Sequence, residues 1–252
     1  MTDRYAVIGN PIAHSRSPFI HERFAAQTGQ DLVYERLLAP LDRFEATVQA
    51  FVQAAPAHTL SFDARGSSAE NTDGIGLVRD LVERHAVVLK GSRAVILGAG
   101  GAASGVVLPL LEAGVRDVLI VNRTAARARA LAERLGHSGA SQAAIAGAGF
   151  EALDASRAAG AILINATSAG LSDARLPLSD AVFAAVAFAY DMVYGPRPTA
   201  YLVQAAAAGC PRQADGLGML VEQAAESFRL WRGVAPQTEP VYRELRTAIG
   251  NA

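Results

Sequence analysis

Apolar residues in the first part of the chain follow a pattern that alternates between strands and helices. The runs Tyr5–Gly9 and Leu32–Leu38 are short and largely apolar, which predicts two strands. Helices are expected from about Pro18 and over Leu41–Val52, where apolar side chains recur three or four positions apart. The order strand, helix, strand, helix is typical of a parallel sheet covered by helices. The predicted fold class is therefore α/β.

A hairpin and a linking helix are predicted next, ahead of a second series of strands. The segments Thr59–Asp63 and Ser67–Glu70 flank the turn residues Arg65-Gly66, which favours a hairpin. Apolar residues at helical spacing indicate a helix over Asp73–Arg84, and a second domain is expected from near Val88. The strands predicted in this domain are Arg93–Leu97, Asp117–Val121, Ala161–Asn165 and Phe188–Met192. Two last helices are predicted at Leu217–Trp231 and Val241–Ile249.

Composition excludes several classes of partner. The 252 residues carry a formal net charge of −1, so neither nucleic acid nor an anionic membrane is expected as a partner. Cys210 is the single cysteine, which excludes an internal disulfide and a cysteine-based metal cluster, and no metal site is predicted. The uncharged stretch Ala94–Leu111 contains glycines and a proline, which favour a soluble strand-turn-helix unit over a membrane span. No apolar signal segment follows Met1, so a cytoplasmic protein is expected.

The clearest chemical signal is a glycine-rich turn between the strand Arg93–Leu97 and a predicted helix. Gly98-Ala-Gly-Gly-Ala-Ala103 lets the backbone approach a pyrophosphate at a helix N-terminus, which predicts a Rossmann dinucleotide site. NAD sites usually place an acidic residue at the end of the next strand, whereas Asp117–Val121 is followed by Asn122-Arg-Thr124. The Arg123 guanidinium suits a 2′-phosphate, so NADP is predicted as the cofactor.

Polar clusters also stand at the ends of other predicted elements, and each allows two interpretations. Ser15 and Ser17 suit the hydroxyls or carboxylate of a polar ligand, or Ser17 caps a helix with Pro18 in its first position. Asp73, at the start of a helix, is either functional or a helix cap. Asn165-Ala-Thr-Ser-Ala-Gly170 ends a strand where Rossmann ligands bind, which predicts a cofactor contact.

Taken together these clusters resemble the shikimate dehydrogenase family from Tyr5 to near the C-terminus. The motifs that carry the resemblance are Gly9-Asn-Pro-Ile-Ala-His-Ser-Arg-Ser-Pro18, Asn71-Thr-Asp-Gly74, Gly98-Ala-Gly-Gly101 with Asn122-Arg-Thr124, Asn165-Ala-Thr-Ser-Ala-Gly170, Tyr190-Asp-Met192 with Tyr194, and Asp215-Gly-Leu-Gly-Met219 with Gln223. The resemblance implies a smaller α/β substrate domain, residues 1–84 with 217–252, and an NADP-binding Rossmann domain, residues 85–216, with a cleft between them.

The same resemblance implies roles for individual residues. The residues matching the family's shikimate-contacting positions are Ser15, Ser17, Thr59, Asp73, Tyr194 and Gln223. The residues matching its NADP-contacting positions are Gly98, Ala99, Gly100, Gly101, Ala102, Asn122, Arg123, Thr124, Arg127, Thr167, Met192 and Gly216. Asp73 is the one catalytic acid/base candidate that the match supports.

The chain departs from the family between its second helix and the hairpin. The family carries a strand there that ends in Asn-Val-Thr-x-Pro-x-Lys, followed by helices, whereas here Phe51–His58 runs almost directly into Thr59. The lysine of this motif is therefore missing, and the resemblance implies that it serves as the acid/base in the family. The only lysine of the chain is Lys90. We expect a truncated substrate domain. His58 is either a substitute base, because its ordinary pKa suits neutral pH, or a loop residue with no role.

The resemblance implies NADP-dependent interconversion of 3-dehydroshikimate and shikimate in aromatic amino-acid biosynthesis, by a monomer or homodimer. Without the lysine, we expect impaired turnover, because a placed acid/base typically contributes about 10²–10⁴ in rate. Two alternatives stay open at this point. One is a non-catalytic NADP-binding protein on the same scaffold, and the other is a dehydrogenase of shifted, quinate-type specificity.

Overall fold

The structure is a computed structural model that describes residues 2–54, 60–63, 66–69, 71–136, 144–167 and 175–250. It divides into two compact units, one of Met1–Thr72 with Val221–Leu245 and the other of Asp73–Leu220 with Arg246–Ala252. Each unit contains β-sheet of its own.

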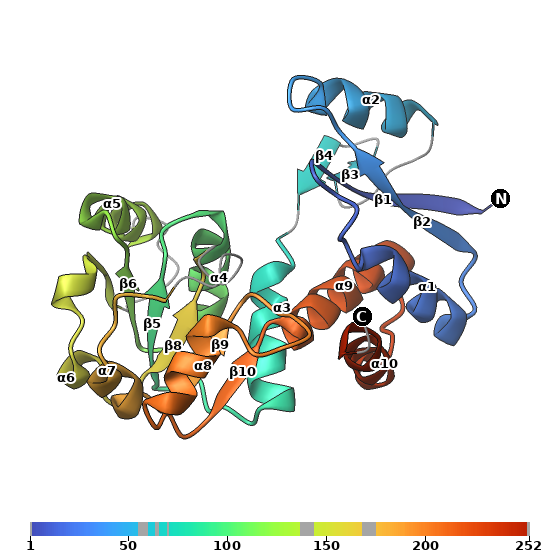
Figure 1. The fold of residues 1–252 in the computed structure, drawn as a ribbon. Coiled ribbons are helices and arrows are strands. Elements are labelled where there is room, and N and C mark those ends of the chain that lie inside the picture. The colour runs from blue at the N-terminus through green and yellow to red at the C-terminus, as the bar shows by residue number, and fades with distance from the viewer. Residues whose placement is uncertain are drawn as a thin grey trace. The chain divides into compact units, whose positions relative to one another are not determined.

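The larger unit is built on a six-stranded sheet in the order β10-β9-β8-β5-β6-β7, in which every pair of neighbouring strands is parallel (Figure 1). Its strands are β5 (Arg93–Leu97), β6 (Asp117–Val121), β7 (Ala144–Ala148), β8 (Ile162–Asn165), β9 (Phe188–Asp191) and β10 (Gln213–Asp215). The chain runs outward from β5 through β6 to β7 and then returns to β8 on the other side of β5. This reversal of strand order is the switch point of the doubly wound dinucleotide-binding fold.

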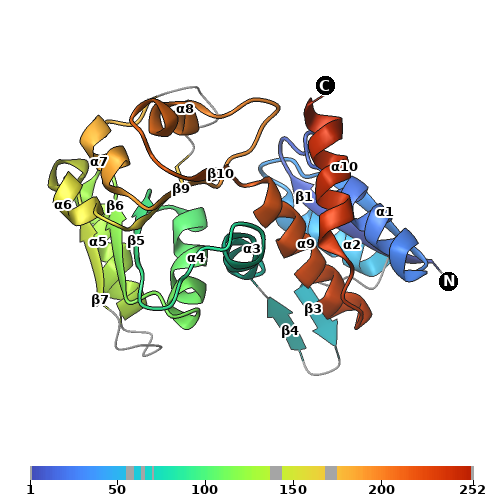
Figure 2. The same cartoon turned by 90° about the horizontal axis from the view of Figure 1, so that it is seen from below.

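Helices cover both faces of this sheet, which makes a three-layer α/β unit (Figures 1 and 2). The helices that contribute to the core on one face are α3 (Asp73–Arg79), its π-helical continuation η1 (Asp80–Arg84), α4 (Gly101–Glu112) and α5 (Ala125–Gly136). The helices on the other face are α6 (Ala155–Ala158), α7 (Asp180–Ala185) and α8 (Ala200–Ala207), with a short 3-10 turn η2 (Phe150–Ala152).

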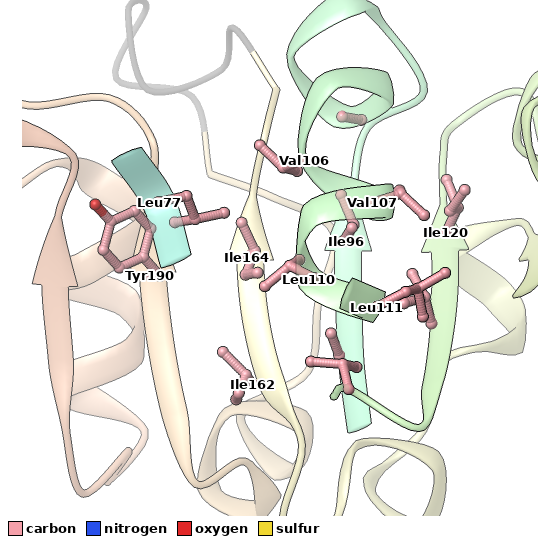
Figure 3. Close-up of a cluster of buried hydrophobic side chains, with 14 of the residues drawn as sticks. Leu77, Ile96, Val106, Val107, Leu110, Leu111, Ile120, Ile162, Ile164 and Tyr190 are labelled. Atoms are coloured by element: carbon pink, nitrogen blue, oxygen red, sulfur yellow. The ribbon is translucent and has the colours of Figure 1, made fainter. Parts of the chain in front are cut away.

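Figure 3 shows the first of these two cores. Leu110 and Val106 extend from α4 toward Ile96 and Ile164 on the central strands, and all four side chains are completely buried. The central strands are apolar on both faces because each face packs against helices, as expected for a parallel sheet. The prediction of a strand-turn-helix unit over Ala94–Leu111 is confirmed by β5 and α4. In the described part of the chain, no helix has the length and apolar character needed to cross a membrane.

Two strands of this sheet were not predicted. β7 has the sequence Ala-Ile-Ala-Gly-Ala, which lacks the β-branched and aromatic residues typical of strands. Its small side chains allow α5 to lie close, since a Cβ on Gly147 would stand 2.3 Å from the carbonyl carbon of Ala128. β10 has only three residues and pairs only through Gln213–Asp215 with β9. Neither segment carries a periodic pattern long enough to reveal a strand.

The smaller unit contains β1 (Asp3–Gly9) and β2 (Leu32–Leu38), which pair in parallel from Asp3 opposite Leu32 to Gly9 opposite Leu38. Its further elements are α1 (Ser17–Thr28), α2 (Phe44–Ala54), the antiparallel hairpin of β3 (Leu60–Asp63) and β4 (Gly66–Ala69), most of α9 (Leu217–Arg232) and much of α10 (Thr238–Gly250). The strand-helix-strand-helix order and the hairpin agree with the sequence predictions.

An aromatic cluster forms the core of this unit. Trp231 on α9 stacks on Tyr5 with ring centroids 4.7 Å apart, and His21 on α1 stacks on Tyr34 at 4.2 Å. Phe24 and Phe228 pack edge to face at 5.7 Å and are fully buried. Burial lowers the pKa of His21 to about 3, so this histidine is neutral over the physiological range.

The boundaries of the units differ from those expected from the sequence. Residues 73–84, expected in the substrate domain, belong to the larger unit, because Leu77 and Leu81 are completely buried in its core. The other boundary falls inside α9 after Leu220 rather than before the helix at Leu217. One continuous helix therefore contributes its first turn to one unit and the remainder to the other.

Candidate functional site

The predicted cofactor residues all follow strands of the six-stranded sheet. Because these strands are parallel, their carboxyl ends meet at one edge, and this edge includes the switch point between β5 and β8. The turn 98–102 follows β5, and residues 122–127 follow β6. Of the remaining candidates, Thr167 follows β8, Met192 follows β9 and Gly216 follows β10. Residues separated by more than a hundred positions in sequence are thus assembled along one edge.

The glycine-rich turn leaves backbone exposed at the start of α4. Gly98 has φ +110°, a conformation that favours glycine, and its amide donates to the Val121 carbonyl at 2.7 Å. Gly100 occupies the N-cap position without a side-chain cap. A Cβ added to Gly100 or Gly101 would meet no atom within 4 Å, so these glycines face open space. An uncapped helix start with accessible backbone N–H groups fits an anionic pyrophosphate.

The corner after β6 presents cations without an acidic competitor. Asn122 donates from its side-chain amide to the Thr124 carbonyl at 3.1 Å, which fixes the turn into α5. Arg123, Thr124 and Arg127 are exposed, and no acidic residue occurs between Val121 and Arg127 in the sequence. In the described ranges, neither the Arg123 nor the Arg127 guanidinium is in an ion pair with a carboxylate. Both guanidinium groups are therefore available to a phosphate.

A buried polar network joins the loops that follow β8 and β9. The Asn165 side-chain oxygen accepts from the backbone amide of Thr167 at 3.1 Å and from its hydroxyl at 2.7 Å. The Asn165 side-chain amide in turn donates to Asp191 Oδ1 at 3.0 Å. Asn165 and Asp191 are completely buried. Burial raises the pKa of Asp191, and hydrogen bonds from Thr199, Val193 and Asn165 counter part of that rise.

The last strand end brings two predicted cofactor residues into direct contact. A Cβ on Gly216 would lie 2.2 Å from the Met192 carbonyl oxygen, so only glycine permits this approach of the two loops. The Gly216 amide donates to the Val193 carbonyl at 3.3 Å. Asp215, just before Gly216, accepts from the Leu217 amide at 3.2 Å and pairs with Arg246. These contacts explain the glycine after β10 by packing.

In the smaller unit, Ser15 and Ser17 lie together in the segment between β1 and α1. Their hydroxyl oxygens are 3.2 Å apart, and the Ser15 hydroxyl accepts from the Ser17 amide at 3.3 Å. The interpretation of Ser17 as the N-cap is wrong, because α1 begins at Ser17 and Arg16 holds the cap position. The Arg36 guanidinium on β2 donates twice to the Ser15 carbonyl, at 2.9 and 2.6 Å. A hydrogen bond also joins Ser17 to Tyr34, whose pKa burial raises to about 12.

Gln223, another predicted substrate residue, forms part of a second polar group in the same unit. The Thr72 hydroxyl donates to Gln223 Oε1 at 3.2 Å and lies 3.1 Å from the Ser227 hydroxyl. Ser227 also donates to the Gln223 carbonyl at 3.0 Å, within α9. These contacts orient the Gln223 side chain. Thr72 belongs to the Asn-Thr-Asp-Gly motif, so the structure gives that threonine a supporting contact that spacing did not reveal.

Asp73 and Tyr194 lie in the larger unit. Asp73 is the first residue of α3 rather than the residue before it, and it remains accessible to solvent. Its carboxylate nevertheless loses part of its hydration at the helix start, and this desolvation raises the pKa of Asp73. Tyr194 is half-buried in the loop after β9. Thr59 and His58, the remaining candidates, lie outside the described residues.

These features define a class: a doubly wound sheet with an open glycine turn at its switch point belongs to Rossmann-type dinucleotide-binding proteins. The sequence matches three profiles of one family within that class. They are the shikimate dehydrogenase substrate binding domain at residues 7–57, shikimate / quinate 5-dehydrogenase at 80–172, and the shikimate 5′-dehydrogenase C-terminal domain at 216–246. The chain belongs to the shikimate dehydrogenase family, which confirms the resemblance seen in its motifs.

Individual relatives agree with this assignment over nearly the whole chain. A shikimate dehydrogenase (NADP(+)) of Herminiimonas arsenicoxydans is 48% identical over 278 aligned positions, covering 99% of each chain. Among solved structures, an Ael1 enzyme from Pseudomonas putida has a TM-score of 0.86 and 40% identity, covering 97% of this chain and 98% of that one. A shikimate 5-dehydrogenase of Thermus thermophilus in complex with NADP(H) and shikimate has a TM-score of 0.79 and 30% identity, covering 98% of this chain and 100% of that one.

Proposed function

We propose that this chain binds NADP(H) and interconverts 3-dehydroshikimate and shikimate, with turnover reduced by the loss of the family's lysine. The carboxyl edge of the six-stranded sheet carries the proposal, because it combines an open glycine turn with a free guanidinium at the end of β6. The names of the relatives, NADP-dependent shikimate dehydrogenases, supply the substrate. Cytoplasmic localisation, a monomeric or homodimeric state and the absence of nucleic-acid partners stay predictions from the sequence.

The residues of the larger unit fit the proposed cofactor. The uncapped start of α4 receives the pyrophosphate, and the open space beside Gly100 and Gly101 gives it room. Arg123 pairs with the 2′-phosphate, supported by Arg127, and Thr167, Met192 and the Gly216 backbone serve the rest of the dinucleotide. When bound, NADP supplies the acceptor for a hydride from the substrate's secondary alcohol.

The proposed substrate residues supply hydrogen bonds and one titratable group. Ser15, Ser17, Tyr194 and Gln223 are donors and acceptors suited to a polyhydroxylated carboxylate, and Thr59 completes the proposed set. Oxidation of the alcohol releases its hydroxyl proton, and Asp73 is the group that we assign to accept it. A raised pKa makes the Asp73 carboxylate a better base than an ordinary one.

Two observations support the proposed loss of a block before the hairpin. The alignment with the Herminiimonas arsenicoxydans relative spans 278 positions although the chain has 252 residues, so it contains gaps opposite residues of the relative. The first two profiles leave residues 58–79 unmatched, which is where the block is expected. The lysine of this block would have been the cationic neighbour of Asp73. Without that positive charge, the ionised form of the Asp73 carboxylate is stabilised less.

One experiment separates this proposal from a non-catalytic NADP-binding protein. NADPH binding and shikimate-dependent NADP reduction are measured on the same sample. We expect tight binding with turnover that is detectable but low, and a further loss of turnover in Asp73→Asn with NADPH affinity unchanged. Binding with no turnover at all favours the non-catalytic alternative, and the absence of NADPH binding refutes the proposal.

The same assay resolves the two remaining alternatives. His58→Ala leaves turnover nearly unchanged if His58 has no role, whereas a large loss with a pH profile breaking near the ordinary histidine pKa of about 6.5 identifies it as the base. Quinate in place of shikimate tests the specificity that one profile's description includes. A higher kcat/KM for quinate would assign the chain to the quinate-type branch.

A further inference from the structure

Asp191, at the end of β9, is a buried carboxylate that has no direct place among the proposed cofactor contacts. It accepts hydrogen bonds from three residues: the Asn165 side-chain amide at 3.0 Å, the Val193 backbone amide at 3.1 Å and the Thr199 hydroxyl at 2.5 Å. Its side chain is completely buried. Hydrogen bonds to a charged acceptor are about twice as strong as neutral ones, so this carboxylate holds all three donors in place.

Two of these bonds bracket one loop. Val193 lies at the beginning and Thr199 at the end of the segment that connects β9 to α8, so one carboxylate fixes both of its ends. Thr199 is also the N-cap of α8, where its hydroxyl oxygen accepts from the Leu202 amide at 3.4 Å. The bracketed segment contains Tyr194, and Met192 immediately precedes Val193.

The third bond extends the same control to the loop after β8. The side-chain oxygen of Asn165 accepts hydrogen bonds from the backbone amide and the hydroxyl of Thr167. The side-chain amide of Asn165 donates to Asp191. An asparagine that donates to a carboxylate keeps its oxygen turned toward Thr167, so Asp191 fixes the orientation of the whole side chain. The three loop residues Thr167, Met192 and Tyr194 are thus linked to one buried group.

A dinucleotide crosses the switch point with one nucleotide on each half of the sheet. The glycine turn and Arg123 belong to the half formed by β5, β6 and β7, which receives the adenosine bisphosphate portion. The loops held by Asp191 follow β8 and β9, in the half that remains for the nicotinamide nucleotide.

We infer that Asp191 is a positioning residue for the nicotinamide half of the cofactor site, acting through Asn165 and Thr199 rather than by touching the cofactor. This inference rests on the proposed function, because it requires NADP(H) to bind at this edge. It predicts that loss of the Asp191 network weakens binding of the nicotinamide half of the cofactor but not binding of the adenosine half.

The test compares NADPH with adenosine 2′,5′-bisphosphate, which reports on the adenosine half alone. Asp191→Asn keeps the shape of the side chain but replaces one acceptor oxygen with a donor. We expect it to raise the Kd for NADPH about tenfold or more, and to change the Kd for adenosine 2′,5′-bisphosphate by less than about twofold.

A matched pair at Thr199 keeps the test decisive if Asp191→Asn does not fold. Thr199→Val removes the hydroxyl while retaining the branched shape, and Thr199→Ser retains the hydroxyl. Thr199→Val is expected to weaken NADPH selectively, and Thr199→Ser is expected to bind NADPH like the parent chain. Tm is measured for every variant.

The outcomes separate the inference from the proposed function. Equal weakening of both ligands, or unchanged NADPH affinity in Asp191→Asn and Thr199→Val, overturns the positioning role. Failure of Thr199→Ser to preserve NADPH binding also overturns it, because the hydroxyl would not be the relevant feature. If the parent chain binds neither ligand, the proposed function itself is refuted.

Discussion

The two units of this chain differ in how completely their apolar surfaces are covered. The six-stranded sheet has helices and buried clusters on both faces, and its strands β8 and β9 are entirely buried. The smaller unit has only two paired strands besides its hairpin in the described ranges, and large apolar side chains of β2 and the segment after it remain exposed. Leu38 is 62% exposed, Leu41 88% and Phe44 52%.

This difference bears on the proposed loss of a block from the smaller unit. Soluble proteins expose single apolar residues routinely, but a group within one short segment normally marks a surface that something else covers. The segment lies at the start of α2, and the position of the proposed missing block follows the end of that helix. We interpret the exposed residues as the surface that the family's additional strand and helices would cover.

The largest expected effect comes from restoring the block. Inserting a segment with the family's Asn-Val-Thr-x-Pro-x-Lys block between α2 and the hairpin is predicted to raise shikimate-dependent turnover by about 10²–10⁴, because it returns a placed acid/base. The control is the same insertion with alanine in place of its lysine, which restores the cover but not the chemistry. A restored block without a gain in turnover would show that the missing lysine does not limit this protein.

Substitutions of two leucines test the contrast in burial directly. Leu110 is completely buried against the six-stranded sheet, so Leu110→Ala is expected to lower the free energy of unfolding by about 2–5 kcal/mol. Leu41 is 88% exposed, so the same change there is expected to stay within about 0.5 kcal/mol. Urea unfolding monitored by circular dichroism measures both. A large cost at Leu41 would mean that the exposed segment is buried in solution.

The cofactor half is expected to bind NADP(H) normally, because the proposed deletion lies in the smaller unit. Arg123→Ala removes one charge-assisted contact with the 2′-phosphate and is predicted to cost about 1.5–3 kcal/mol, or roughly ten- to a hundredfold in NADPH affinity. NADH affinity should not change, because NADH lacks that phosphate. Titration of both cofactors against the parent and the variant measures this. Equal affinities of the parent chain for NADPH and NADH would remove the basis for assigning Arg123 this role.

The smaller unit is expected to lose stability in mild acid through His21. The folded pKa of His21 is lowered to about 3 by burial, whereas the unfolded chain has the ordinary value of about 6.5. The unfolded state therefore binds more protons below pH 6.5. The stabilising contribution is complete above that value and is lost as the pH falls toward 3, amounting to about 2 kcal/mol between pH 7 and pH 5.

Trp231, the only tryptophan, lies in the same aromatic cluster and reports unfolding of this unit by its fluorescence. Urea midpoints at pH 7 and pH 5 give the acid loss for the parent chain. His21→Phe keeps an aromatic ring but cannot be protonated, so it is expected to reduce the difference between the two midpoints. An undiminished difference in His21→Phe would assign the acid sensitivity to other groups.

The sequence by itself determined the local elements and the identity of the cofactor half. β5 and β6 were predicted with the bounds that the structure shows, because buried parallel strands are continuous apolar runs and each is followed by a distinctive turn. Gly98, Asn122 and Arg123 were predicted as cofactor residues for the same reason, since a turn and a strand end are encoded by adjacent residues. The resemblance to the family followed from the order of such local motifs.

Only the tertiary structure decided what depends on contacts between distant segments. β7 was missed because its small residues are required by the close approach of α5, which no local pattern records. The hydrogen bonds of Asp191 reach Asn165, 26 positions away in sequence, and Thr199, 8 positions away. This spacing gave no indication that the three residues form one network. The burial of His21 and of the residues after Asp73 likewise depends on which elements pack against them. Sequence patterns specify which face of an element is apolar, but packing specifies which partner covers it and which polar groups become enclosed.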